Sequence, residues 1–153
     1  MKLSTKGRYG LRAMIDLVQN SQKDNISLKS ISERQGISMN YLEQIIAILK
    51  KSGYVKSTRG AKGGYSLAKE PKDISVGDIL RALEGDLNPV DCTLVNDGKQ
   101  CDDVDCCITK IVWKKISDSI NDVVNNITLQ DLVDDHNNST STSNSVTVTR
   151  EKC

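Results

Sequence analysis

Four cysteines crowd into one internal stretch and are the residues best suited to chemistry. Cys92, Cys101, Cys106 and Cys107 follow a C-x8-C-x4-C-C pattern. Soft thiolates grouped in this way suit zinc or an iron–sulfur cluster. The paired C-x2-C spacing of structural zinc sites is missing, so by spacing alone a metal site competes with thiol redox chemistry and with inert cysteines.

The charge of the chain is divided between its two halves. The net charge is +1, but residues 1–72 hold 14 Lys and Arg against 5 Asp and Glu, a net of +9 that leaves −8 for the remainder. A basic half of this kind is typical of proteins that bind polyanions. With no Phe and 3% aromatic residues, there is little material for stacking on single-stranded bases. Duplex DNA is therefore the expected partner.

Hydropathy bears on where the protein works. No run approaches the roughly 18 to 20 apolar residues that span a bilayer, so a membrane-spanning protein is excluded. The first ten residues lack the apolar core of a secretory signal. We expect a cytoplasmic protein with reduced cysteines and no membrane partner.

Helical periodicity and capping residues predict three helices before the first glycine-rich segment. The first begins after Ser4 or Thr5 and reaches about Gln19, with an apolar face of Leu11, Met14, Ile15 and Val18. Ser27 caps a second helix that ends at Gly36, and Ser38 caps a third. The second and third helices fit a helix-turn-helix, which presents the start of its second helix to the major groove.

The third helix carries apolar residues on one side and base-reading groups on the other. Asn and Gln can bond adenine, Glu can accept from cytosine, and Ala lets the backbone approach thymine methyl groups. An ordinary solvated helix face is the alternative interpretation. Leu42, Ile45, Ile46 and Leu49 form the expected buried face, and the candidate major-groove residues are Ser38, Asn40, Tyr41, Glu43 and Gln44.

Two short strands around a glycine-rich loop follow, at residues 54–57 and 65–68. A hairpin in this position is typical of a wing. A nucleotide-binding phosphate loop is the competing interpretation, but the spacing matches neither a Walker nor a dinucleotide pattern. We expect Arg59 and Gly60 to engage the minor groove. Candidate phosphate contacts are Lys6, Arg8, Lys56 and Lys62.

The second half of the chain predicts two further helices and a long amphipathic one. Ser75 caps a helix that ends at Gly85, and residues 86–105 are loop-like and acidic. An apolar stripe from Ile108 to Ile127 then predicts a long helix that suits packing against a second copy, with burial within the monomer as the alternative. Thr128 caps a short final helix over residues 129–133.

The predicted fold is mainly α with a small β-hairpin: a winged helix-turn-helix domain plus a long C-terminal dimerisation helix. The DNA-binding domain spans residues 1–72, and a linking helix and loop span 73–91. The cysteine-bearing cluster loop is 92–107, followed by the dimerisation helix and short terminal helix at 108–134. Residues 135–153 are rich in Ser, Thr and Asn and are expected to be disordered.

Several collinear segments carry a family resemblance. MKLSTKGRYGLRAM, ISERQGIS, MNYLEQI, RGAKGGYSL and the stretch from Cys92 through Trp113 to NNITLQDLV resemble the IscR-type iron–sulfur cluster regulators, a group of bacterial dimeric winged-helix repressors. The resemblance covers about residues 1–134. It implies a 2Fe–2S cluster, delivered by the iron–sulfur assembly machinery, that reports iron–sulfur supply to the promoters of assembly genes. It also implies that the carboxylate of Glu43 bears on discrimination between classes of DNA site.

The resemblance implies three cysteine ligands and one histidine ligand. Cys92, Cys101 and Cys107 match the cysteine positions, but Lys110 stands where the histidine is expected, and an ammonium group is a poor ligand. Cys106, an Asp of the loop, His136, a solvent thiol and a partner subunit are candidates for the fourth ligand. The departure keeps open a repressor of the same family that is clusterless or responds to nitric oxide or to cysteine metabolism.

A small thiol redox protein that uses Cys106 and Cys107 is the remote alternative. The chain lacks a C-x-x-C redox motif and a histidine near the cysteines. The sequence therefore predicts a transcriptional regulator, mainly a repressor, and not an enzyme.

Overall fold

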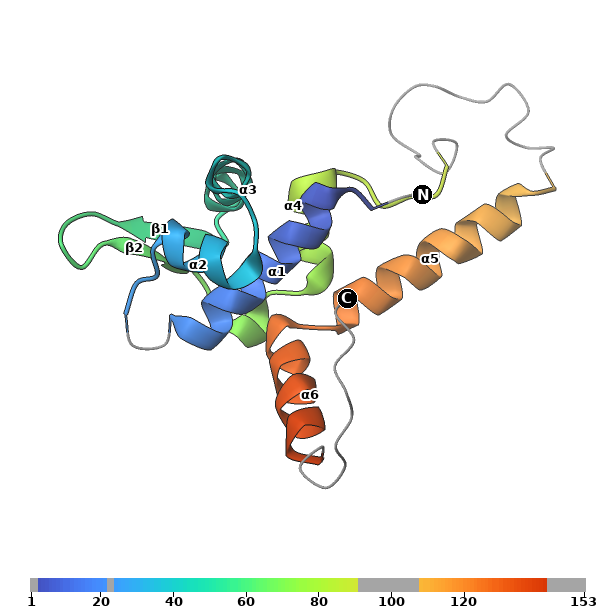
Figure 1. Cartoon of the computed structure of the whole chain (residues 1–153). Coiled ribbons are helices and arrows are strands. Elements are labelled where there is room, and N and C mark those ends of the chain that lie inside the picture. Colours follow the sequence, from blue (N-terminus) through green and yellow to red (C-terminus); the bar gives the residue numbers. More distant parts are fainter. Residues whose placement is uncertain (1–2, 22–23, 91–107, 143–153) are drawn as a thin grey trace.

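The computed structural model describes residues 3–21, 24–90 and 108–142. Figure 1 shows a body of short helices with a hairpin at one side, from which α5 and α6 project. This confirms a mainly α fold with a small β-hairpin. The elements are α1 (Thr5–Asn20), α2 (Leu28–Gln35), α3 (Met39–Lys51), β1 (Val55–Thr58), β2 (Gly64–Leu67), the short 3₁₀ helix η1 (Pro71–Asp73), α4 (Val76–Glu84), α5 (Lys110–Asn126) and α6 (Leu129–Thr142).

The predicted capping residues stand at the helix ends. The Ser4 side chain accepts a hydrogen bond from the Lys6 amide, and that of Ser27 accepts one from the Ser30 amide. Gly36 ends α2 in the left-handed conformation, with φ 65°. Satisfying the free amides of a first turn in this way fixes where each helix begins.

One hydrophobic core joins the N-terminal helices to α4 and α6. This core includes residues beyond Lys72, the last residue of the expected DNA-binding domain. Residues of α4 and α6 are buried in it together with those of α1 and α3. The predicted inner face of α3 is confirmed. The core includes Ala13, Met14 and Leu17 of α1, Leu42, Ile45, Ile46 and Leu49 of α3, Ile79 and Leu83 of α4, and Leu129 and Val133 of α6.

The buried face of α1 is rotated from the face that periodicity predicts. Leu11 and Ile15 are only partly buried, whereas Gly7 and Gly10 are buried. A Cβ on Gly10 would lie 2.0 Å from Cδ1 of Leu83. The two glycines therefore let α4 approach the α1 backbone, a role that apolar periodicity does not register.

The hairpin is anchored to the segment before α2. Strands β1 and β2 pair antiparallel, with Val55 opposite Leu67 and Thr58 opposite Gly64. Ile26 and Tyr65 exchange two backbone hydrogen bonds of 2.8 Å each. Gly64 has φ 148°, and a Cβ there would lie 2.7 Å from the carbonyl oxygen of Ile26.

Replacing Gly64 with Ala should loosen this hairpin. The strained backbone and the clash with Ile26 should lower the free energy of unfolding by about 2 to 4 kcal/mol. Gly60→Ala is the matched control, because Gly60 also has a positive φ but a Cβ there meets no atom within 4 Å. Urea unfolding at one protein concentration measures both. Equal losses in the two variants would contradict the anchoring role.

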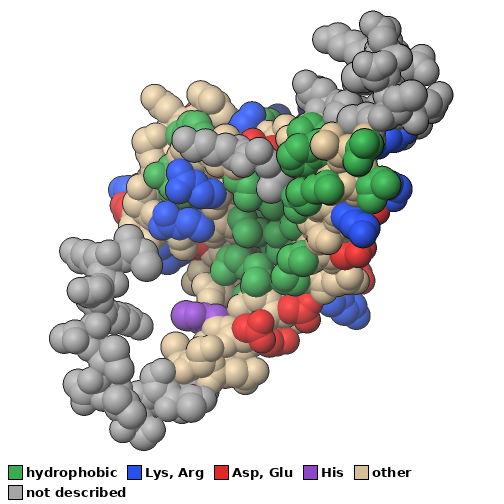
Figure 2. All heavy atoms as spheres, turned by 90° about the vertical axis from the view of Figure 1, so that its right-hand side faces the viewer, with side chains coloured by type: hydrophobic (Ala, Val, Ile, Leu, Met, Phe, Trp, Pro, Cys, Tyr) green, Lys and Arg blue, Asp and Glu red, His purple; other side chains and the backbone are tan. Residues whose placement is uncertain are grey.

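Helix α5 packs on α4 through only part of its apolar surface. Ile120, Val124 and Ile127 pack against a small cluster made by Val76, Leu80 and Leu87. Other apolar side chains of the stripe remain exposed, and Figure 2 shows hydrophobic side chains gathered on the face of the molecule that carries α5. Packing within the monomer thus buries only the side of the apolar stripe that faces this cluster. The exposed members are Ile108 (88% exposed), Ile111 (63%), Val112 (52%), Ile116 (38%) and Val123 (59%).

Helix α6 is longer than the sequence predicts. It runs to Thr142, so residues 135–142 of the segment expected to be disordered are helical. Thr128 and Asp131 cap its start reciprocally, and the hydrogen bond from the Thr128 amide lowers the pKa of Asp131. A capped first turn with Leu129 and Val133 buried nucleates the helix, and the sequence up to residue 142 holds no Gly or Pro to stop it.

None of the helices within residues 3–21, 24–90 and 108–142 is both long and apolar enough to cross a membrane.

Candidate nucleic-acid interface

Helix α3 presents its polar side to solvent. Asn40, Glu43 and Gln44 are exposed, and Tyr41 is half-buried. Ser38 occupies the N-cap position, but its side chain makes no capping hydrogen bond, in contrast to the predicted cap. The Ser38 side chain therefore satisfies none of the free amides in the first turn of α3.

A polar network fixes the turn between α2 and α3 against α1. Arg34 donates to both carboxylate oxygens of Asp16, from Nε at 2.9 Å and from Nη2 at 2.6 Å. The Gln35 side chain donates to the same carboxylate at 2.9 Å, and Arg12 donates to the Gln35 carbonyl oxygen at 2.6 Å. Asp16 is only 1% exposed, and its hydrogen bond raises the pKa of Arg34. The network ties the end of α2 and the turn that follows it to α1.

Two tyrosines connect α1 to the start of α3. The rings of Tyr9 and Tyr41 meet edge to face, with centroids 5.9 Å apart. The Arg12 guanidinium lies 5.6 Å from the centroid of the Tyr9 ring. Such contacts are favourable because a ring edge and a cation both complement the negative face of an aromatic ring. Part of Tyr41, which the sequence nominated for DNA contact, therefore packs within the protein.

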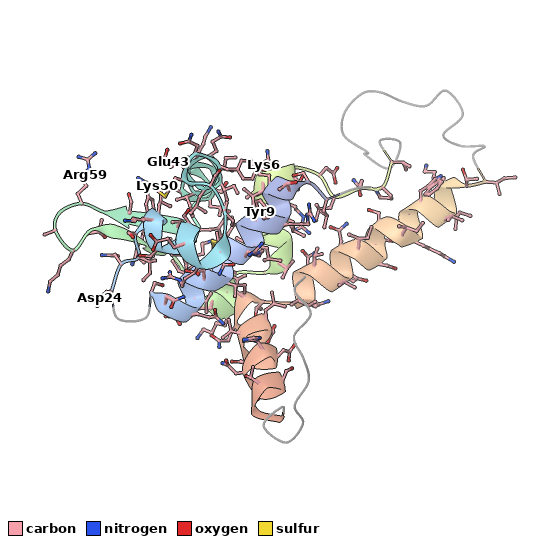
Figure 3. The ribbon with its side chains drawn as sticks, in the orientation of Figure 1. Lys6, Tyr9, Asp24, Glu43, Lys50 and Arg59 are labelled. Carbon is pink, nitrogen blue, oxygen red and sulfur yellow. The ribbon has the colours of Figure 1, made fainter. Side chains whose placement is uncertain are left out.

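The wing lies beside α3 and is tied to it. Lys50 of α3 donates a 2.6 Å hydrogen bond from Nζ to the Ser57 hydroxyl of β1. In Figure 3, Arg59 extends from the hairpin on the same upper side of the molecule as Glu43, and Lys6 lies on that side as well. The structure thus brings Glu43 of α3 and Arg59 of the wing to the same side of the molecule.

The two predicted phosphate-binding lysines of the hairpin, Lys56 and Lys62, do not lie on the side that faces α3. Strand residues alternate between faces, so Lys56 points away from Ser57 and from α3. Lys56 and Lys62 line an open groove on the other side of the hairpin, together with Asn25 and Ser66. These two lysines are therefore separated from the face that carries Glu43, although they remain at the edge of the wing.

The start of α1 holds the remaining predicted phosphate contacts. Arg8 is exposed and Lys6 is half-buried. The Ser4 and Gly7 amides of this turn both donate to the side chain of Glu84, which sequence reasoning did not single out. The sequence separations of 80 and 77 residues explain why no local pattern indicated the contact.

The predicted metal ligands fall outside the described residues. Cys92, Cys101, Cys106 and Cys107 all lie between residues 91 and 107. Lys110 is the first residue of α5 and is exposed, and His136 is exposed on α6. Among the residues that the structure describes, no group of three His, Cys, Asp or Glu side chains is placed to hold a metal ion.

A helix-turn-helix with an adjoining two-stranded wing defines a winged-helix DNA-binding protein. A family model described as Rrf2, iron-dependent transcriptional regulator, matches residues 3–135. The chain belongs to the Rrf2 family of transcriptional regulators. The predicted family resemblance is thereby confirmed.

Individual relatives place the chain more closely within the family. It is 44% identical over 133 residues to the HTH-type transcriptional regulator IscR of Pectobacterium atrosepticum, covering 87% of this chain and 79% of that protein. T. potens IscR is similar in structure, with 51% identity, a TM-score of 0.72 and coverage of 89% and 88% of the two chains. CymR, the global cysteine regulator of B. subtilis, gives 42% identity, a TM-score of 0.71 and coverage of 86% and 95%. The chain is thus a transcriptional regulator of the IscR type.

Proposed function

We propose that this regulator is a cytoplasmic homodimeric repressor that senses iron–sulfur supply through a 2Fe–2S cluster and controls iron–sulfur assembly genes. The observation that carries the proposal is a 51% identity to T. potens IscR in a chain whose Cys92, Cys101 and Cys107 fit the cysteine positions that the family resemblance implies. The iron–sulfur assembly machinery would supply the cluster. The role is regulatory and not enzymatic.

The donor set fits such a cluster in three of its four positions. Cys92, Cys101 and Cys107 would hold it as thiolates, the ligands that iron–sulfur clusters prefer. Lys110 offers an ammonium group with donors only, so the fourth ligand must come from elsewhere, and Cys106 is one candidate. When bound, the cluster would supply a redox- and iron-sensitive group in the stretch of sequence that connects α4 to α5.

DNA recognition is assigned to the face that carries α3 and the upper side of the wing. Glu43 and its neighbours on α3 would read the major groove, while Arg59 and Gly60 would enter the minor groove. Lys6 and Arg8 would bind phosphates there, and Lys56 and Lys62 would do so from the other side of the hairpin. A coupling of about 1 to 3 kcal/mol between cluster and DNA would change affinity roughly 5- to 150-fold.

The cluster assignment is tested by an absorption spectrum with iron and sulfide analysis on protein purified without oxygen. We expect bands between about 320 and 600 nm with matched iron and sulfide. Cys92→Ala, Cys101→Ala and Cys107→Ala should each lose them, whereas the control Cys153→Ala should keep them. Full iron and sulfide in all three variants would overturn the ligand assignment.

A second candidate function is a clusterless repressor that responds to thiol state, to cysteine metabolism or to a partner enzyme. Lys110 at the expected histidine position favours it, as does the similarity to the cysteine regulator CymR. Colourless protein that resists reconstitution yet binds its operator unchanged would select this candidate.

Replacing Glu43 with Ala should broaden the sequence preference of the protein. A carboxylate beside the wrong base repels its acceptors, so its loss should reduce discrimination between operator classes by about tenfold. Lys51→Ala, at the far end of the same exposed face, should lower affinity for all sequences alike. Competition binding with paired operators measures both, and unchanged selectivity in Glu43→Ala would count against the assignment.

A further inference from the structure

The carboxylate of Glu84 caps the first turn of α1, although the two lie far apart in the sequence. Its Oε1 atom accepts hydrogen bonds from the Ser4 amide at 3.2 Å, the Ser4 hydroxyl at 2.5 Å and the Gly7 amide at 2.8 Å. The first turn of α1 contains no acidic residue of its own. Glu84 therefore supplies the negative charge that the start of a helix favours.

This contact depends on close packing between α1 and α4. A Cβ on Gly7 would lie 2.4 Å from Oε1 of Glu84, so a side chain at this position would displace the carboxylate from where it now lies. The Gly7 amide belongs to the first turn, where amides have no acceptor within their own helix. Its protection from solvent exchange thus depends on Glu84.

Residues close to Glu84 in the sequence contact α5. Glu84 is the last residue of α4, and Leu87, three residues later, is buried beside Ile120. The hydroxyl of Ser117 donates to the side chain of Asn88, and Ser117 is the buried residue of α5. Arg81, one turn before Glu84, donates to Asn121 at 2.9 Å. Helix α5 therefore contacts the chain on both sides of Glu84.

The same turn carries groups assigned above to DNA. Lys6 lies between Ser4 and Gly7, the two residues that donate to Glu84, and Arg8 follows immediately. We propose that Glu84 is a positioning residue that transmits movement of α5 and of residues 86–90 to the DNA-facing start of α1. The inference rests on the proposed function in one respect, namely that Lys6 and Arg8 contact DNA in a regulated way.

The coupling itself is tested on the full chain without DNA, by amide hydrogen exchange at Gly7. Asn88→Ala releases the contact to α5 and should speed Gly7 exchange by about tenfold in the parent protein. Glu84→Ala should speed it by itself, and adding Asn88→Ala to that variant should then contribute less than about threefold. Gly7 exchange that is unchanged by Asn88→Ala would show that Glu84 is only a static cap, and would overturn the proposal.

The second measurement is operator affinity with and without reconstitution by iron and sulfide. The ratio of the two affinities should fall to within about threefold of one in Glu84→Ala, while Glu84→Gln, which keeps an Oε1 acceptor, should retain most of the parent's ratio. The control Glu33→Gln should match the parent. Equal operator affinity of the parent protein with and without reconstitution would contradict the proposed cluster sensing. The exchange experiment would still show whether Glu84 couples α5 to the start of α1. A full ratio in Glu84→Ala would overturn the role of Glu84.

Discussion

Val112→Asp is expected to convert the proposed dimer into monomers and to abolish tight operator binding. Val112 is 52% exposed and lies with Ile116 and Val123 on the side of α5 that does not face α4. A carboxylate at the centre of an apolar contact would be buried without a partner, at a cost of several kcal/mol. Because paired half-sites gain about 10²- to 10⁴-fold in affinity from linkage, the monomer should lose at least about 100-fold.

Sedimentation equilibrium and operator titration measure the two effects on the same sample. Lys114→Gln is the matched control, since Lys114 is 71% exposed on another side of the same helix and forms only a solvent-exposed pair with Asp118. The control should remain dimeric and bind normally. A Val112→Asp protein that stays dimeric would show that the exposed stripe of α5 is not the dimer contact.

Arg34→Met should strongly reduce the stability of the folded protein. It removes both hydrogen bonds from the guanidinium to Asp16 and leaves a carboxylate that is 1% exposed with Gln35 as its remaining side-chain partner. Breaking a buried ion pair costs about 3 to 5 kcal/mol, and the 38% exposure of the Arg34 side chain reduces this to about 2 to 4 kcal/mol. Urea unfolding at fixed protein concentration measures the loss.

A neighbouring surface pair supplies the control for Arg34. Lys29 and Glu33 lie 3.9 Å apart on the same helix with side chains 78% and 66% exposed, so Glu33→Gln should change stability by less than about 0.5 kcal/mol. Asp16→Asn should cost less than Arg34→Met, because the freed guanidinium can turn into solvent. Equal stability of Arg34→Met and Glu33→Gln would contradict the account of this network.

The features that follow from neighbouring residues were predictable from the sequence. Helix starts at Ser4, Ser27 and Ser75 depend on a hydroxyl and the amides two or three residues later, so local pattern is enough. The buried face of α3 follows from 3.6-residue periodicity, and the wing follows from strand propensity around glycines. The length of α6 was missed because composition says little about how far a well-nucleated helix continues.

The features that depend on distant pairing were not predictable in this way. Asp16 sits on the buried side of an apolar helix, and the arginine that neutralises it lies 18 residues away. The carboxylate of Glu84 meets α1 across about 80 residues, in a space that Gly7 leaves open. Such contacts depend on how the helices pack, and no local pattern in the sequence identifies either residue of the pair.

Recognition of DNA by α3 and the wing of two copies is tested most directly by footprinting. The protein first selects duplexes from a random pool, and its footprint is then measured on the selected DNA. We predict two symmetric protected half-sites whose centres lie about 10 base pairs, or a multiple of that spacing, apart. Arg59→Ala should remove protection at the minor-groove positions while leaving that of the major groove. A single unsymmetrical protected block, or a footprint that Arg59→Ala leaves intact, would contradict recognition by α3 and the wing of two copies.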